Sequence, residues 1–449
     1  MVLRETDHTD FHIKVEGKWM LITKEILHSH PGGVAISSYK DRDATTVFHT
    51  FHAGSSRAYK MLQSVWKEQK DLTFNIPVEK EEVPILGLDD INMGKFDKSD
   101  EESKQITENF DKLRHKVRKM GLLKGNTTFF IGKFFQCIGI ISLAIFLQSQ
   151  GIYIPSALLM GLAWQQLGWM IHEYCHHQHF ENHYANDLAS YIVGNLLQGF
   201  SSGGWKEQHN VHHAATNVVG RDGDLDLMPF WATVASDLKF AQHASSFLLQ
   251  ILPYQHIYWT FGLPFLRLSW LLQSIIFVSK MDRSEFEIHR TRARYEQITL
   301  FIHWILVGLQ LYYLPDNNTR LTYFLVSQLV GGFLLAHVVT YNHYSTDKFP
   351  NKSRILENYP CLQLYTTRNM RPGPFIDWLW GGLNYQIEHH LFPTMPRNNL
   401  GKVMPLVKEF CIENNLPYMV DDYFTGWKKG IEQFQNVADV AYKLKMKLM

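Results

Sequence analysis

The chain has 449 residues, too many for one typical core and enough for two or three structural units. Its formal net charge is +1, which excludes a nucleic-acid partner recruited by bulk charge. Hydrophobic residues make up 45% of the chain and charged residues 19%, a balance typical of a protein partly in lipid, while the mean hydropathy of -0.18 indicates that much of it is not. The 23 histidines, with no poly-His tract, require an explanation.

The N-terminus and the cysteines favour a protein that faces the cytosol. The first ten residues are polar and acidic, so no cleavable signal peptide is expected. The cysteines form no CxxC pair, which favours reduced thiols over a disulfide framework. The four of them lie far apart: Cys137, Cys175, Cys361 and Cys411.

Residues 8–75 are expected to form a small soluble α+β domain. They contain His30-Pro31-Gly32-Gly33 and, further on, Asp43-Ala44-Thr45 and Phe48-His49-Thr50-Phe51-His52. These residues resemble the heme-binding segments of cytochrome b5 domains, in which two histidines ligate heme b from opposite sides. The resemblance implies ligands at His30 and His52, with His49 as the rival second ligand. Two axial imidazoles leave the iron no open position for oxygen, so such a domain transfers electrons.

A linker and a first helical hairpin follow this domain. Residues 76–110 are rich in proline and charge, which predicts a linker. A basic run precedes the apolar residues 129–149, and by the positive-inside rule this places the N-terminal domain in the cytosol. Residues 153–171 follow a short polar break and are long enough to return through the bilayer.

A second hairpin is expected at residues 299–314 and 321–341. The apolar region 246–278 is interrupted by two prolines and an arginine. One extra span there would put the last histidine cluster on the opposite membrane face, so an interfacial or re-entrant helix pair is expected. Residues 111–449 are therefore predicted to form an all-α polytopic membrane domain with about four transmembrane helices.

Three histidine clusters lie in this domain. On a helix, positions i, i+3 and i+4 share one face, so each cluster should aim its ligands in one direction. The first cluster should aim two imidazoles, the second three, and the third two imidazoles and an amide. A lone histidine is usually a core or surface residue, but repeated ligand spacing indicates metal binding. The clusters are His172-Glu-Tyr-Cys-His176-His177, His209-Asn-Val-His212-His213 and Gln386-Ile-Glu-His389-His390.

An eighth histidine ligand is expected at His343. His172 directly follows the second predicted span and His343 lies two residues past the fourth, so both should lie at the same depth on the cytosolic side. His337 lies deeper and on another helix face, and Asn342 is a neighbour that could hold water. Eight imidazoles exceed what one metal can take and imply two. Iron is favoured by the attached heme domain, because zinc has no use for single electrons.

His172 to His176 also matches HExxH, the zinc-protease pattern in which Glu173 would be the general base. An intramembrane zinc protease is therefore an alternative. Such a site needs only one further ligand, whereas this chain offers two more clusters.

The acidic run Asp222, Asp224 and Asp226 superficially matches a calcium loop. Position six of such a loop should be Gly but is Leu227, and position twelve is Thr233 instead of Glu. Calcium is therefore not expected. These acids are either acceptors for hydrogen bonds from nearby histidines or solvated surface.

The fused b5-like domain with HxxxH, HxxHH and QxxHH resembles the front-end fatty-acyl desaturases, in which Gln386 stands where other desaturases have histidine. The N-terminal MVLRE and longer stretches are similar to nematode delta-5 fatty-acid desaturases, with delta-6 relatives close behind. Glu173 stands where many front-end enzymes have Asp, which conserves charge. The longer stretches are GGWKEQHNVHHAATNVVGRDGDLDL, HVVTYNHYS and TTRNMRPGPFIDWLWGGLNYQIEHHLFPTMPR.

The resemblance implies an enzyme that uses O2 and a di-iron centre to place a cis double bond at C5 of a C20 polyunsaturated acyl chain. It implies heme b, electrons from NADH through NADH-cytochrome b5 reductase, and an acyl-CoA or acyl-lipid substrate. It also implies the endoplasmic reticulum membrane, with the heme domain and the histidine clusters facing the cytosol. Arg368 and Arg371 could grip the phosphates of a thioester carrier or simply anchor the cytosolic face.

Other functions remain open at this stage. A delta-6 or delta-8 front-end desaturase would carry the same motifs, because tunnel length is a three-dimensional property. Fatty-acid hydroxylases also join a b5 domain to histidine-rich di-iron sites, and QxxHH argues against them only by resemblance. A non-catalytic membrane heme carrier would leave seven clustered histidines idle.

Overall fold

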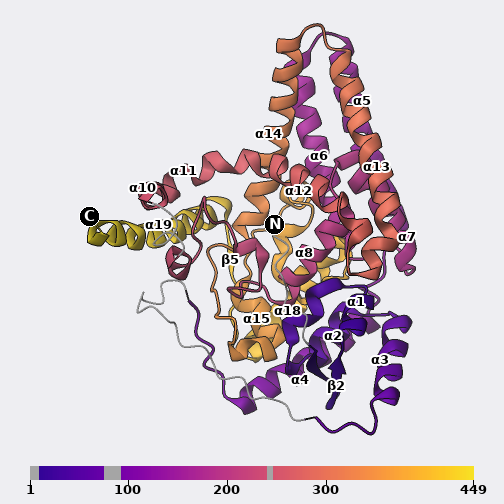
Figure 1. The fold of residues 1–449 in the computed structure, drawn as a ribbon, viewed down its shortest axis with the longest axis vertical. Coiled ribbons are helices and arrows are strands. Elements are labelled where there is room, and N and C mark those ends of the chain that lie inside the picture. The colour runs from indigo at the N-terminus through magenta and orange to yellow at the C-terminus, as the bar shows by residue number, and fades with distance from the viewer. Residues whose placement is uncertain (1–9, 75–92, 240–245, 449) are drawn as a thin grey trace.

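The structure is a computed structural model that describes residues 10–74, 93–239 and 246–448. The MVLRE stretch at residues 1–5 and most of the Pro- and charge-rich stretch, up to residue 92, lie outside these ranges. The described residues are mostly helical, with α5 (Thr127–Ser149), α6 (Tyr153–Cys175), α13 (Glu287–Tyr312) and α14 (Asn317–Tyr341) rising at one end and the strands and helices of residues 10–74, in indigo, at the other (Figure 1).

Residues 10–74 form a small unit with both strands and helices. Strand β1 (Phe11–Val15) pairs antiparallel with β2 (Lys18–Ile22) and parallel with β3 (Arg42–Asp43), which gives the order β2-β1-β3. Buried and half-buried residues alternate along β1, because successive side chains of a strand point to opposite faces. The helices of this unit are α1 (Lys24–Ser29), α2 (Thr45–Phe51) and α3 (Ser56–Glu68).

Helix α4 (Asp100–Lys119) corrects the prediction that residues 76–110 are a linker throughout. The Ser99 hydroxyl accepts a hydrogen bond from the Glu102 amide, and the Glu102 carboxylate accepts one from the Ser99 amide at 2.8 Å. Acidic residues fill the first turn and basic residues the last, as the helix dipole favours. The charges from residue 100 onward that predicted a linker are therefore those of a capped helix. Its buried face consists of Ile106, Phe110, Leu113 and Val117.

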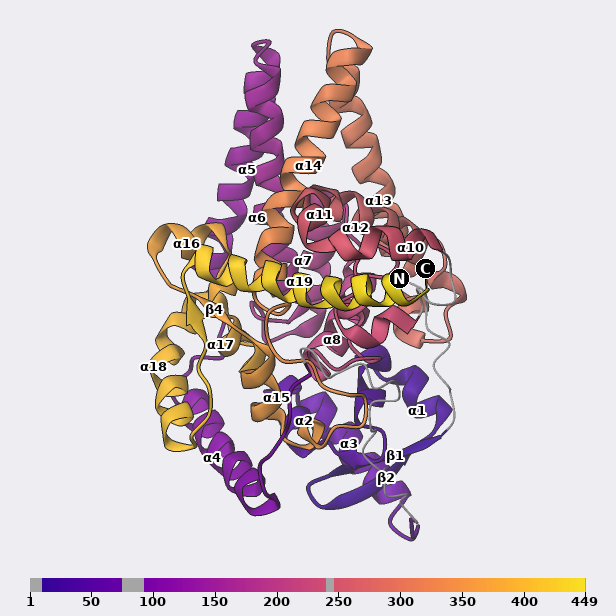
Figure 2. The same cartoon turned by 90° about the vertical axis from the view of Figure 1, so that its left-hand side faces the viewer.

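Four long helices cover the four predicted spans. They are α5 (Thr127–Ser149), α6 (Tyr153–Cys175), α13 (Glu287–Tyr312) and α14 (Asn317–Tyr341). They stand side by side and point away from the N-terminal unit (Figures 1 and 2).

By length and apolar composition, three helical stretches of the described residues could cross a membrane, namely Thr127–Ser149, Phe247–Val278 and Asn317–Tyr341. Helices α6 and α13 are not among these three, although they pack beside α5 and α14. Within α6 the side chains of Gln165 and Gln166 are buried and hydrogen-bonded, Gln165 to the Leu379 carbonyl at 2.7 Å.

The region 246–278 is broken into three helices, where a helix pair was expected. These are α10 (Ser246–Ile251), α11 (Gln255–Gly262) and α12 (Leu266–Val278), separated by short 3-10 turns that contain Pro253 and Pro264. Proline lacks an amide hydrogen and interrupts the helical ladder. The three helices run across the four long helices rather than along them (Figures 1 and 2).

The remaining elements surround the end of the long helices that faces the N-terminal unit, which we call the foot. The C-terminal helix lies across that foot in Figure 2. A π-helical segment occupies Tyr191–Gln198, and a two-stranded parallel sheet joins β4 (Asn369–Met370) to β5 (Val420–Asp421). The helices are α7 (His183–Ser190), α8 (Ser202–Ala214), α15 (Tyr359–Thr366), α16 (Pro374–Leu379), α17 (Gln386–Leu391), α18 (Arg397–Glu413) and α19 (Tyr423–Leu448).

The N-terminal unit is packed directly against this foot. Ala214 at the end of α8 and Phe286 just before α13 are buried in the hydrophobic core of the unit. The Arg221 guanidinium donates a hydrogen bond to the Ser38 carbonyl across the interface. The unit therefore has a defined position beside α8, where the second histidine cluster lies.

Candidate metal centre

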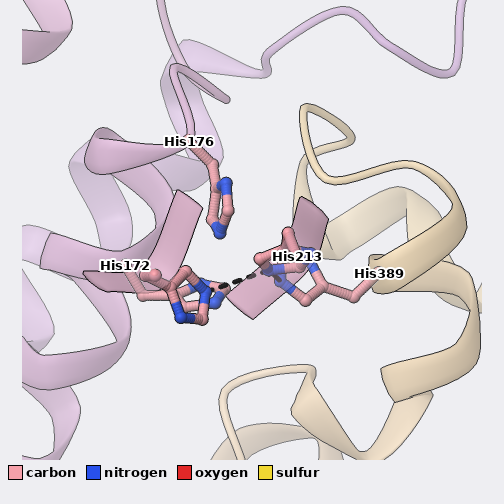
Figure 3. Close-up of side chains that lie close together, drawn as sticks. His172, His176, His213 and His389 are labelled. Atoms are coloured by element: carbon pink, nitrogen blue, oxygen red, sulfur yellow. Dashed lines mark hydrogen bonds between the residues drawn. The ribbon is translucent and has the colours of Figure 1, made fainter. Parts of the chain in front are cut away.

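Five histidines from three segments bring ring nitrogens together at the foot of α6. Each offers a nitrogen within 4.8 Å of every other. The Nε2 atom of His213 lies 3.0 Å from Nε2 of His209 and 3.1 Å from Nε2 of His389. Figure 3 shows four of the five rings, with His172 and His176 from α6 facing His213 and His389. We call His172, His176, His209, His213 and His389 the five-histidine group.

A second set, the three-histidine group, consists of His212, His343 and His390. The ring of His212 lies 4.7 Å from that of His343 and 5.0 Å from that of His390, between centroids. The two groups are adjacent, because the His390 ring stacks on His213 at 4.1 Å. The eight predicted histidines therefore converge, but the second and third clusters are each divided between the two groups. The expectation that each of these clusters aims its imidazoles in one direction was wrong.

Hydrogen bonds at Nδ1 fix the rings of the three-histidine group. The Nδ1–H of His212 donates to a carboxylate oxygen of Asp222 at 2.9 Å, and that of His343 donates to the Thr366 carbonyl at 3.0 Å. A donor at Nδ1 leaves a lone pair at Nε2, which is the arrangement of a metal-binding imidazole. Asp222 thus has the acceptor role that its sequence position allowed.

Gln363 ties the two groups together and was not identified from the sequence. Its Oε1 accepts hydrogen bonds from Nδ1 of His390 at 2.8 Å and from the Thr216 hydroxyl at 2.9 Å. Its Nε2 donates to the His213 carbonyl at 3.0 Å. The only sequence signal was a glutamine in an otherwise apolar stretch of α15.

Trp205, one turn before His209 on α8, is a second residue that the sequence analysis missed. Its ring lies 4.0 Å from the His209 ring, 5.2 Å from His172 and 5.7 Å from His176, between centroids. It packs one side of the five-histidine group and helps to keep water out.

Gln386 lies beside the three-histidine group. Its Nε2 donates to Nε2 of His343 at 3.0 Å, and its Oε1 accepts from Asn342 at 3.1 Å. Asn342 also keeps a buried Oδ1 atom without a hydrogen-bond partner. Asn342, the predicted neighbour of His343, therefore lies beside the three-histidine group together with Gln386.

The donor sets fit two metal ions. The Nε2 atoms of His172, His176 and His390 are buried and lack a hydrogen-bond partner, and a buried polar atom left unpaired costs about 1–3 kcal/mol. Two nitrogens at right angles on a metal, with bonds of about 2.1 Å, stand about 3 Å apart. The spacings of 3.0 and 3.1 Å around His213 match that geometry.

The protonation states also suit metal binding. Burial and neighbouring imidazoles hold the pKa of His213 well below its usual range, and burial lowers the pKa of His343 to about 3. Neutral imidazole is the form that ligates metals. His212 differs: burial lowers its pKa, but the carboxylates of Asp222 and Asp224 outweigh burial and raise it to about 9.

Glu173 does not face the five-histidine group. Its carboxylate pairs with the Arg397 guanidinium at 2.9 Å, and both side chains are buried. The general base of a zinc protease would have to face a metal held by His172 and His176. The HExxH pattern is therefore present in the sequence, but Glu173 does not lie where the general base of a zinc protease would have to lie.

His177, from the first sequence cluster, and His337, from α14, lie outside both groups. His177 has a φ of 56°, and its Nε2 lies 3.3 Å from a carboxylate oxygen of Asp187. His337 donates from Nδ1 to the Phe333 carbonyl at 2.9 Å. Neither belongs to a metal-ligand group of the described chain.

Arg368 and Arg371 connect β4 to β5. The Arg368 guanidinium pairs with the Asp421 carboxylate and is buried, while the Arg371 amide donates to the Asp421 carbonyl at 2.9 Å. The Arg368 pairing favours an anchoring role over a grip on phosphates.

In the N-terminal unit, His30 and His52 face each other with ring centroids 6.2 Å apart. Their Nδ1 atoms donate to the carbonyls of Gly33 at 3.2 Å and Phe48 at 2.9 Å, which leaves the lone pair of each ring on Nε2. His49 has both ring nitrogens engaged, Nδ1 with the Tyr59 hydroxyl at 2.7 Å and Nε2 with the Glu16 carboxylate at 3.1 Å.

Comparison with known proteins agrees with this chemistry. The family model described as Fatty acid desaturase matches residues 151–421, which include all eight histidines. The Delta(5) fatty acid desaturase fat-4 of Caenorhabditis elegans is 61% identical over 449 residues, 100% of both chains. The Delta(6)-fatty-acid desaturase fat-3 of the same organism is 50% identical over 95% of this chain and 96% of its own. The Delta(8)-fatty-acid desaturase of Euglena gracilis is 35% identical over 88% of each chain.

Proposed function

The chain belongs to the fatty acid desaturase family, and from this we propose that it is a front-end desaturase acting at delta-5 of C20 polyunsaturated acyl chains. As a member of the family it is an oxygen-dependent oxidoreductase of lipid metabolism. The observation that carries the delta-5 assignment is 61% identity along the whole chain to a Delta(5) enzyme, against 50% to a Delta(6) enzyme. The products would be arachidonoyl and eicosapentaenoyl chains.

We assign the two histidine groups as the ligands of two iron ions. Bound iron would supply the activation of O2 that removal of two hydrogens from the acyl chain requires. Burial favours the neutral form of His213 and His343, while Asp222 orients His212 and Gln363 orients His390. Gln386 would adjust the three-histidine group through His343 rather than act as a principal ligand.

We assign His30 and His52 as the axial ligands of heme b. The neighbouring rings of His30 and His52, each with its Nε2 lone pair free of the Nδ1 hydrogen bond, support this assignment, and the full use of both His49 nitrogens argues against the rival ligand. A Cβ at Gly32 would stand 2.7 Å from Cε1 of His30, so glycine is needed for the ring to take this position.

The membrane arrangement that fits these assignments has four spans, at α5, α6, α13 and α14, with α10 to α12 along the membrane surface. The basic run before α5 supports a cytosolic location for the heme unit and the histidine groups. We place the protein in the endoplasmic reticulum membrane, with NADH-cytochrome b5 reductase as its electron donor and an acyl-CoA or acyl-lipid as its substrate.

Expression in yeast fed single C18 or C20 polyenoic acids tests the function. A new double bond at C5 of C20 substrates is the expected product, located by double-bond analysis of the extracted fatty acids. New bonds only at C6 of C18 substrates would reject delta-5 in favour of delta-6. Hydroxylated products without new double bonds would reject desaturation itself.

A further inference from the structure

An aromatic side chain next to His52 touches the five-histidine group. Phe51 is the last residue of α2, and its ring stands edge-on to the His213 ring with centroids 6.4 Å apart and planes at 80°. Aromatic rings in contact favour this T-shaped arrangement. A ring that precedes one assigned heme ligand in the chain therefore contacts an assigned iron ligand.

Phe51 lies where two hydrophobic cores meet. It packs against the core of the N-terminal unit and also against the larger core that contains Tyr359. The Tyr359 ring lies 6.4 Å from it, and the Tyr359 hydroxyl donates to the His390 carbonyl at 2.5 Å. Ala214, the residue after His213, belongs to the core of the N-terminal unit. The Phe51 ring is thus held from both sides.

Polar contacts fix the same interface further from the rings. Arg221 donates to the Ser38 carbonyl, and the buried Arg42 donates to the Ser353 carbonyl at 3.3 Å. Buried hydrogen bonds with a charged donor are costly to break. The distance between His52 and His213 is therefore fixed by the contacts that hold the N-terminal unit against the rest of the protein.

We propose that Phe51 is the contact through which electrons pass from the heme site at His30 and His52 to the five-histidine group. The proposal rests on the proposed function, because it requires both cofactors. The step moves one electron and no proton: the heme iron is oxidised as the iron that the five-histidine group would hold is reduced, and NADH, through the reductase, replaces the electron. Phe51 is a positioning residue that supplies packed atoms where a gap would otherwise separate the sites.

Heme reoxidation in the purified full-length protein provides the test. The heme is reduced with NADH and reductase, then mixed rapidly with air-saturated buffer and acyl substrate while its absorbance is followed. Phe51→Leu should slow reoxidation by about tenfold or more, because it removes the ring but keeps an apolar side chain. Phe51→Tyr should restore a rate close to that of the unaltered protein. Heme content, midpoint potential and reoxidation by ferricyanide should stay unchanged in both variants.

Phe286→Leu is the matched control. Phe286 is buried in the same interface core, but it packs on His28 and His289, away from both histidine groups. Equal rates in Phe51→Leu and the unaltered protein, or equal slowing in Phe51→Leu and Phe286→Leu, would overturn the proposal. If the unaltered protein lacks a two-histidine heme spectrum, the proposed heme assignment fails instead, and the two failures are thereby told apart.

Discussion

His212 and His213 are adjacent in the chain, yet their imidazoles belong to different groups. Successive residues of a helix point about 100° apart. His213 therefore reaches the five-histidine group while His212 turns to Asp222 and the three-histidine group. His389 and His390 are divided in the same way on α17, so single helical turns serve both metal sites.

Two histidines at the end of α14 test the assignment of the three-histidine group: His343, which belongs to the group, and His337, which does not. His343→Ala removes a ligand and should abolish product formation, with a loss above about 100-fold, and lower the non-heme iron content. His337→Ala removes a histidine that bonds only the Phe333 carbonyl among the described residues and should retain iron. Metal analysis and yeast product assays check both. Iron loss in His337→Ala with retention in His343→Ala would reverse the assignment.

Asp222→Asn should lower iron affinity about 10- to 100-fold, because the ring of His212 loses the carboxylate that fixes its Nδ1–H. Titration of the iron-free protein with ferrous iron measures the change. Asp226→Asn removes an exposed carboxylate four residues further along and serves as the control. Equal affinities in the two variants would show that Asp222 does not orient a ligand.

The buried pair Glu173 and Arg397 is expected to act in stability rather than in proton transfer. Arg397→Met leaves a buried carboxylate unpaired and should cost roughly 3–5 kcal/mol, seen as faster thermal inactivation. The double variant with Glu173→Gln should recover much of this loss and still form product. A double variant that is stable but inactive would restore a catalytic role for Glu173.

His52→Ala should abolish the Soret absorbance of bound heme, because one of the two Nε2 atoms assigned as axial ligands is lost. His49→Ala should keep it, since Tyr59 and Glu16 already occupy both nitrogens of His49. Absorbance spectra of the oxidised and reduced proteins decide between the ligands. Heme loss confined to His49→Ala would transfer the ligand role to that residue.

Chelation should separate the two cofactors. A chelator of ferrous iron is expected to remove the non-heme iron and stop product formation, while the heme spectrum persists because porphyrin holds its iron. Activity should return with added ferrous iron and not with zinc. Recovery of desaturation with zinc alone would contradict the assignment of the two histidine groups as iron sites.

Most of the fold and of the set of histidine ligands could be predicted from the sequence. The four long helices were predictable from apolar runs close to bilayer length and from the polar breaks between them. Seven of the histidines were predictable from their repeated spacing, and His343 from its position just past the fourth predicted span. The start of α4 was missed because acidic and basic runs occur both in linkers and in capped helices. The reciprocal contact of Ser99 and Glu102 and the buried apolar face of α4 distinguish the two.

The division of the histidines could not be predicted. It depends on how α8 and α17 are rotated about their axes, and tertiary packing sets that rotation. Gln363 and Trp205 were missed for the same reason, since each acts through contacts with residues far away in the chain. Spacing identifies which residues can bind a metal, but not which of them share one.

His213 and His389 meet although 176 residues separate them. At roughly 5–20 residues per second, a ribosome needs about 10 to 35 seconds to add that stretch. For that time the growing chain carries the histidines of α6 and α8 without their partners from α17. Open imidazole sites bind copper or zinc more strongly than ferrous iron. Binding of the wrong metal is thus a hazard for the unfinished chain. The two histidine groups can close around iron only after His389 and His390 have been synthesised.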